Sequence, residues 1–216
     1  MRFLRRKASL VAERIALIDY GAGNLHSVHS ALQAAGATGV EVTADPDFVA
    51  GADRIVLPGV GAFGACRDAL FGIEGMVETL ENRVLGDAMP FLGICVGMQL
   101  MAEYGLEHGT HEGLSWVAGT VEEMEPFDDI KIPHMGWNDV LPTDPNSLIE
   151  EGEAYFLHSY QFKCNQVPSS VSATTFHGRS IVAAIQSGTA IGVQFHPEKS
   201  QAYGLSFLKR FLEWKP

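Results

Sequence analysis

Short apolar runs that alternate with helical stretches fill the first half of the chain and most constrain its fold. The runs lack the in–out alternation of a half-exposed strand, so each predicts a strand buried on both faces. Strands separated by helices are typical of a largely parallel sheet that helices cover. The strands predicted in this half are Ile15–Asp19, Gly39–Val42, Arg54–Leu57 and Pro90–Ile94.

The helical spacing of apolar residues predicts the connecting helices. We expect Asn24 to cap the start of the first helix and Gly36 to stop it. At the carboxyl end, Leu205, Leu208 and Leu212 share one helical face. The other helical segments are Ala65–Leu70, Gly75–Val84, Gly97–Glu103 and Ser200–Trp214.

The second half of the chain has a different pattern. Strand-like segments there are separated by short turns, which predicts antiparallel hairpins that complete or flank the sheet. These segments are Tyr155–Leu157, Val171–Thr175, Ile181–Gln186 and Ala190–Gln194. Because no repeat or low-complexity linker divides the chain, we expect one α/β domain over residues 14–216, preceded by a basic tail over residues 1–13.

Charge and composition exclude several classes of function. A net charge of −11 disfavours nucleic acid as a partner, since an acidic surface repels phosphates. No apolar run approaches the roughly 20 residues of a membrane span, so we expect no membrane association. The basic first residues lack the apolar core of a secretory signal. Three widely spaced cysteines indicate free thiols in a reducing cytoplasm rather than a disulfide framework.

The sharpest local feature is a predicted strand that runs directly into Gly-x-Cys-x-Gly and then a helix. This order is the nucleophile elbow, with Cys95 in place of the usual serine. Gly93 and Gly97 suit a turn so sharp that a Cβ would collide with neighbouring backbone. The start of a helix favours the reactive thiolate form of the cysteine. We therefore predict that Cys95 is a nucleophile.

A thiolate that attacks a carbonyl needs a base, which also serves as an acid for the leaving group. Among eight histidines, His196 is followed two residues later by Glu198. In extended chain these two side chains lie on one side, so the carboxylate can orient the imidazole as the third member of a triad. His158 is the rival base, but no acidic residue follows it at that spacing.

Acyl transfer also needs donors for the negative charge that builds on the carbonyl oxygen. The backbone amide of Val96, next to the nucleophile, is one candidate. Gly59 or Val60, in the glycine-rich loop Pro58–Gly64, supplies the second. That loop lacks the Gly-Lys-Ser/Thr ending of a phosphate-binding loop, so we expect no nucleotide there.

The remaining metal-binding and nucleophilic candidates are weak. His108 and His111 lie in a glycine-rich segment without supporting carboxylate spacing, so we expect a solvated loop and no metal site. Cys66 and Cys164 have no partner in the sequence, and we expect neither to take part in the chemistry.

The segment Gly93–Gln99 together with His196-Pro197-Glu198 resembles the class I glutamine amidotransferases, and the similarity extends from Ile15 to about Trp214. The resemblance implies that Cys95, His196 and Glu198 hydrolyse glutamine to glutamate and ammonia through a glutamyl thioester, without a cofactor. It also implies a glutamine pocket. The residues expected near the substrate's α-amino and α-carboxylate groups are Gln99, His158, Ser159 and Tyr160.

Three further stretches, Ile18–Leu25, Pro58–Gly61 and Lys131–Asn138, resemble one branch of that family, the glutaminase subunits of imidazole glycerol phosphate synthases. This resemblance implies a heterodimer with a separate (β/α)₈ cyclase subunit. The cyclase uses the ammonia to make imidazole glycerol phosphate and aminoimidazole carboxamide ribotide in histidine biosynthesis. Since tryptophan is a common interface anchor, the surface expected to meet the partner includes Met135, Trp137 and Asn138.

Three other functions compete with this one. A cysteine hydrolase or peptidase on a similar elbow would act on γ-glutamyl or ester substrates by itself and gives the segment Lys131–Asn138 no role. A non-catalytic binding module would keep its function after Cys95→Ala. A related glutaminase could serve a different synthase, although the Ile18–Leu25 and Met135–Asn138 stretches favour the histidine branch.

Overall fold

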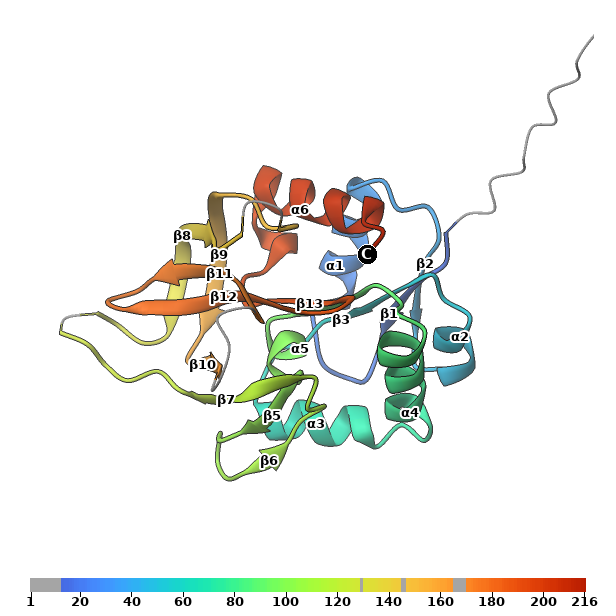
Figure 1. Ribbon diagram of the computed structural model, residues 1–216, viewed down its shortest axis with the longest axis horizontal. Coiled ribbons are helices and arrows are strands. Elements are labelled where there is room, and N and C mark those ends of the chain that lie inside the picture. The colour runs from blue at the N-terminus through green and yellow to red at the C-terminus, as the bar shows by residue number, and fades with distance from the viewer. Residues whose placement is uncertain (1–12, 129, 145–146, 165–169) are drawn as a thin grey trace, which may run out of the picture.

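The computed structural model describes residues 13–128, 130–144, 147–164 and 170–216, so the predicted tail lies outside the described residues except for residue 13. A nine-stranded sheet runs through the molecule (Figure 1). Its strands, from one edge to the other, are β2 (Val40–Thr43), β1 (Ile15–Ile18), β3 (Arg54–Leu57), β4 (Phe91–Ile94), β13 (Ala190–Val193), β12 (Ser180–Ser187), β11 (Val171–Phe176), β8 (His134–Pro142) and β9 (Gly152–His158).

The first five strands of this order are parallel, and the rest are antiparallel. The four predicted amino-terminal strands are therefore confirmed, and so are the predicted carboxyl-terminal hairpins. Each parallel strand except β2 is buried along its whole length, as unbroken apolar runs require. The α/β fold class holds.

Helices cover both faces of the parallel part, with α1 and α6 above it and α3 and α4 below it in Figure 1. The helices are α1 (Leu25–Ala34), α2 (Pro46–Ala50), α3 (Phe63–Phe71), α4 (Met76–Leu80), α5 (Val96–Gln99) and α6 (Gln201–Glu213), with a π-helical turn η1 (Glu81–Gly86) and a 3-10 turn η3 (Pro197–Lys199). No helix of the described ranges is long and apolar enough to cross a membrane.

A second, four-stranded sheet was not predicted. Its order is β10 (Tyr160–Cys164), β7 (Val117–Glu123), β5 (Ala102–Gly105) and β6 (His111–Glu112). It lies beside the large sheet, on the side of α3 and α5 (Figure 1). The helix predicted over Gly97–Glu103 is confirmed only as far as Gln99, because the chain leaves α5 there and enters β5.

Long-range pairing explains that early helix end. The backbone amides of Leu114 and Trp116 donate to the carbonyls of Leu100 and Met101 at 2.7 and 3.0 Å. Those carbonyls cannot also serve a continuing helix in full, so tertiary pairing overrides the local helical preference. The expected Asn24 cap is also absent: Asn24 occupies the capping position of α1 but its side chain makes no capping bond. The predicted stop at Gly36 holds, with φ at +113°.

Strand β13 decides the geometry of the site. Its predicted hairpin with β12 is present, and its other edge pairs in parallel with β4, with Val193 opposite Ile94. Two strands about 100 residues apart in the sequence therefore end side by side at one edge of the sheet. The residues that follow them, Cys95 and His196, meet there.

Candidate active site

Cys95 stands on a sharp turn between β4 and α5. Its φ is +54° and ψ is −108°, a strained conformation for a residue with a side chain. A Cβ on Gly93 would come within 2.6 Å of the Gly97 carbonyl, and one on Gly97 would overlap the Leu57 carbonyl oxygen. Both glycines are therefore required for the steric reason expected. The helix after Cys95 is only one turn long, so its dipole contributes less than a full helix would.

His196 and Glu198 are brought to Cys95 by β13. The Cys95 amide donates to the Val193 carbonyl at 2.8 Å, which ties the elbow to the end of that strand. His196 Nδ1 lies 2.9 Å from Glu198 Oε1, and the two side chains are 3% and 1% exposed. The contact forms through the 3-10 turn Pro197–Lys199, not through the extended chain that was expected.

The surroundings of His196 favour its protonated form, the imidazolium. Burial lowers its pKa, but hydrogen bonds to Cys95 and Glu198, together with the charges of both groups, outweigh burial and raise the pKa to about 9. His196 is therefore protonated at neutral pH. Because Nδ1 faces Glu198, Nε2 is the nitrogen left for the cysteine sulfur.

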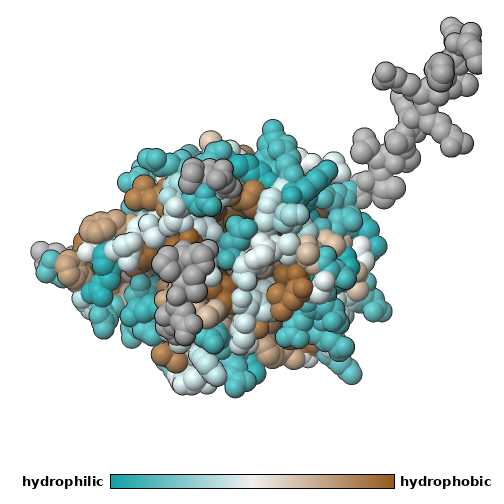
Figure 2. Space-filling view, in the orientation of Figure 1, coloured by the Kyte–Doolittle hydropathy of each residue, from teal (hydrophilic) through white to brown (hydrophobic). Residues whose placement is uncertain are grey.

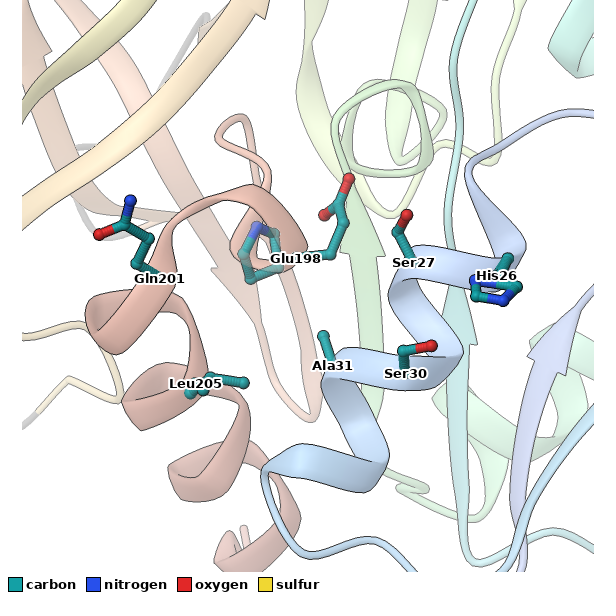
Figure 3. Close-up of a pocket in the computed structure, with 8 residues that line it drawn as sticks. His26, Ser27, Ser30, Ala31, Glu198, Gln201 and Leu205 are labelled. Atoms are coloured by element: carbon teal, nitrogen blue, oxygen red, sulfur yellow. The ribbon is translucent and has the colours of Figure 1, made fainter.

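Glu198 holds the imidazole with one of its two carboxylate oxygens. Oε2 is buried without a hydrogen-bond partner among the described residues. Glu198 lines a cavity of about 390 Å³ between α1 and α6, and Figure 3 shows Ser27 of α1 on the opposite wall. Only one carboxylate oxygen is thus engaged in orienting His196.

The backbone groups expected to form the oxyanion hole lie next to one another, but the Val96 amide is not free to bind an oxyanion. The Val96 amide donates to the Gly59 carbonyl at 3.4 Å, so it is occupied. Tyr20 Oη donates to the Pro58 carbonyl at 2.7 Å, and Cys66 Sγ contacts the Val60 carbonyl at 3.4 Å. These side chains hold the loop in this orientation. Cys66, expected to have no part in the chemistry, therefore contacts the loop beside Cys95, and burial raises the pKa of its thiol.

A pocket of about 170 Å³ opens beside Cys95 and His196. The residues predicted to bind glutamine all line it, namely Gln99, His158, Ser159 and Tyr160. Two charged residues that were not predicted line it as well, Glu107 and Lys199. Lys199 directly follows Glu198, so its position next to the His196-Pro197-Glu198 motif could have predicted its place in the pocket. Glu107 belongs to no recognised motif, and the turn between β5 and β6 of the small sheet brings it to the pocket.

The residues predicted to meet a partner lie apart from this pocket, on β8. Met135 and Trp137 are 61% and 47% exposed, a high exposure for large apolar side chains. Asn138 is half-buried, and its amide nitrogen bonds inward. The structure therefore separates this segment from the elbow while leaving its apolar side chains at the surface.

The weak candidates take structural places. His111 packs against Gly64 of α3, and its Nε2 lies 3.2 Å from the Glu107 carbonyl. Within the described ranges, no group of three or more potential ligands is arranged to hold a metal ion. Cys164, half-buried on β10, lies outside the pocket lining.

Comparisons with known proteins agree with this geometry. The family model for glutamine amidotransferase class-I matches residues 16–214. Imidazole glycerol phosphate synthase subunit HisH of Zymomonas mobilis is 56% identical over 206 residues, covering 94% of this chain and 96% of its own. The protein of the same name from Rhodospirillum rubrum is 50% identical over 214 residues, covering 94% of this chain and all of its own.

Solved structures agree at the level of the fold. The structure of PurLQS from Thermotoga maritima matches with a TM-score of 0.68 at 16% identity, covering 94% of this chain and 97% of that chain. The family model matches almost the whole chain, and both relatives are at least 50% identical to it. The chain therefore belongs to the class I glutamine amidotransferase family.

Proposed function

We propose that this enzyme is the glutaminase subunit of an imidazole glycerol phosphate synthase and supplies ammonia to a separate cyclase subunit in histidine biosynthesis. The buried arrangement of Cys95, His196 and Glu198 at the edge shared by β4 and β13 carries the chemical part. The names of the relatives support the narrower role. In that role the chain works in the cytoplasm, where its three free thiols stay reduced.

The proposed reaction has two halves. The Cys95 thiolate attacks the side-chain amide carbon of glutamine, and the His196 imidazolium gives its proton to the departing nitrogen, so that ammonia leaves and a glutamyl thioester remains. Water then attacks the thioester while His196 accepts its proton, and glutamate and the thiolate are released. Glu198 keeps the imidazole oriented and stabilises its charge in both halves.

The oxyanion of each half needs donors that this conformation withholds. Val96 can donate to the oxyanion only after the Gly59 carbonyl turns away from it. Turning that peptide also points the Val60 amide, which follows the Gly59 carbonyl, toward the site. We propose Gly59, Val60 and Val96 as the backbone of this hole, open only when the loop is rearranged.

The pocket lining fits an amino acid substrate. We propose that Gln99, His158, Ser159 and Tyr160 contact the α-amino and α-carboxylate end of glutamine. Glu107, which also lines the pocket, offers a carboxylate to the α-ammonium group. Glu107 Oε2 already accepts from the Phe63 amide at 2.7 Å, which fixes its position.

A partner subunit follows from the chemistry of the product. Ammonia released into water at neutral pH becomes ammonium, which is not a nucleophile, so a synthesis needs a protected transfer. We propose that Met135, Trp137 and Asn138 lie at the contact with the cyclase subunit. The exposure of Met135 and Trp137 supports this, and Figure 2 shows apolar surface at the end of the molecule that carries β8 in Figure 1.

Glutamate release from glutamine tests the proposal, measured for the chain alone, with a cyclase subunit, and with the cyclase and its nucleotide ligand. We expect strong stimulation in the last mixture and its loss in Cys95→Ala. Cys95-dependent hydrolysis that ignores the cyclase would instead indicate a stand-alone hydrolase or a glutaminase of another synthase. A function retained by Cys95→Ala would indicate a binding module.

A further inference from the structure

A line of buried amides leads from the nucleophile into the protein. Gln194 is fully buried, and its Nε2 donates toward Cys95 Sγ at 3.6 Å. Its Oε1 accepts from Gln99 Nε2 at 3.0 Å, and the same nitrogen donates to the Tyr160 carbonyl at 3.3 Å. A carbonyl can only accept, so the Gln99 atom that faces it must be nitrogen. Gln194 must then turn its oxygen to Gln99 and its nitrogen to the sulfur.

A pair of histidines reaches the same carbonyl from the other side. His158 Nδ1 lies 2.8 Å from the Tyr160 oxygen and must carry the hydrogen. In a neutral ring Nε2 is then the acceptor, and it lies 3.0 Å from His134 Nδ1, which must donate. His134 Nε2 accepts in turn from Asn138 Nδ2 at 3.0 Å. The other hydrogen of that amide goes to the Phe176 carbonyl at 2.9 Å.

Both histidines are neutral at physiological pH, as this direction of donation requires. Burial lowers the pKa of His134 to about 3, with the charges of His158 and His177 acting in the same sense. Burial lowers the pKa of His158 to about 4, against a raising contribution from its bond to the Tyr160 carbonyl. A proton added to His158 Nε2 would face the N–H of His134 Nδ1 at 3.0 Å, and one added to His134 Nε2 would face the N–H of Asn138 Nδ2 at 3.0 Å.

We propose that this line of hydrogen bonds, from Asn138 through His134 and His158 to Tyr160 and from there through Gln99 and Gln194 to the Cys95 sulfur, positions the nucleophile according to the state of strand β8. Gln194 stabilises the thiolate by direct donation. His134 is a positioning residue. It holds His158 and, through His158, the Tyr160 carbonyl at which the histidine pair and the glutamine pair meet.

The inference deepens the proposed function and rests on it in taking Cys95 as the nucleophile and β8 as the partner face. It explains why the strand proposed to face the partner lies next to buried histidines. A partner that moves Asn138 on β8 changes the acceptor side of His134, and the change reaches Cys95 through groups that have only one way to hydrogen-bond. Neither Gln194 nor His134 needs to touch glutamine for this.

The test is the rate at which iodoacetamide alkylates Cys95 in the chain alone near neutral pH, followed by mass spectrometry of the Cys95 peptide. Gln194→Leu removes the donor at similar volume, and we expect about tenfold slower alkylation, the order expected for a hydrogen bond to a charged acceptor. His134→Phe keeps ring stacking on Phe156 but removes both hydrogen bonds, and we expect about threefold slower alkylation.

Two matched variants separate the line from general packing. His134→Asn keeps an amide donor at the level of Nδ1 and should restore alkylation to within about twofold of the unsubstituted chain. His177→Phe keeps the ring that stacks on His134 at 4.2 Å but lies outside the line, and should leave the rate unchanged. If Gln194→Leu fails to fold, the His134 pair still decides.

Alkylation of Cys95 at the unsubstituted rate in Gln194→Leu, or equal rates in His134→Phe and His134→Asn, would overturn the inference. Alkylation uses neither glutamine nor a cyclase subunit. Its outcome is therefore independent of the coupled glutamate-release assay, and failure of one proposal is distinguishable from failure of the other.

Discussion

The elbow around Cys95 and the strand pair β8–β9 contribute to one site in opposite ways. At the elbow, short-range sterics decide the geometry, since Gly93 and Gly97 have no room for a Cβ. In β8–β9, cross-strand pairing decides it, and His134 lies opposite His158 only because the two strands are antiparallel. The elbow is buried, whereas β8 exposes Met135 and Trp137. The proposed reaction chemistry thus depends on locally encoded backbone, and the proposed partner contact on a paired surface strand.

The largest effect on activity is expected at the elbow, from Cys95→Ala. It removes the nucleophile, so we expect loss of at least about a thousandfold in glutamine hydrolysis, with thermal unfolding little changed. Cys164→Ala, at a half-buried cysteine outside the pocket, should keep full activity. Substantial residual turnover in Cys95→Ala would refute the assignment of the nucleophile.

Steric control of the elbow predicts a large stability effect from Gly97→Ala. The new Cβ would overlap the Leu57 carbonyl oxygen, and relief requires backbone movement between β3 and α5. We expect the free energy of unfolding to fall by about 2–4 kcal/mol, measured by chemical denaturation. Gly86→Ala, where no atom lies within 4 Å of the added Cβ, is the control. Equal stability of the two variants would show that the elbow is not under steric control.

Glu198→Gln tests the orientation of His196 inside the buried region. We expect a measurable but roughly hundredfold lower kcat, because the base remains while its orientation and charge stabilisation weaken. In the unsubstituted chain, activity should fall as pH rises through about 9, where His196 loses the proton needed by the leaving ammonia. Removing the Glu198 charge, one of the groups that raise this pKa, should move that limb to lower pH.

The raised pKa of His196 also predicts how the stability of the folded protein depends on pH. The folded pKa of His196 lies above its unfolded value, so its stabilising contribution is complete below pH 6.5 and is lost as pH rises through about 9. An alkaline limb that stays in place in Glu198→Gln, in activity and in unfolding alike, would show that Glu198 does not hold the proton on His196.

The smallest effect is expected at the surface strand. Trp137→Ala should weaken binding of a cyclase subunit about tenfold, the usual order for one aromatic anchor, and leave basal hydrolysis unchanged. Tyr104→Ala, at a 40% exposed aromatic on the small sheet, is the control. Unchanged affinity and unchanged stimulation in Trp137→Ala would remove β8 from the proposed contact.

The contrast between the elbow and the paired strands also explains which features could be predicted from the sequence. The four amino-terminal parallel strands, the elbow and the His196–Glu198 pair follow from local patterns of apolar residues, glycines and spacing. The small sheet did not follow, because β5 pairs with β7 through contacts that only the folded chain supplies. Glu107 came to the pocket by the same route. The closed state of the Gly59–Val96 pair depends on the direction of one carbonyl, which no residue pattern encodes.

The proposed mechanism requires a covalent glutamyl intermediate on Cys95. Acid quenching during turnover, followed by mass spectrometry of the cysteine peptides, would detect it. We expect a glutamyl adduct on the Cys95 peptide and none on the peptides of Cys66 and Cys164. Steady glutamate release without an adduct on Cys95, or with the adduct on another cysteine, would contradict the mechanism.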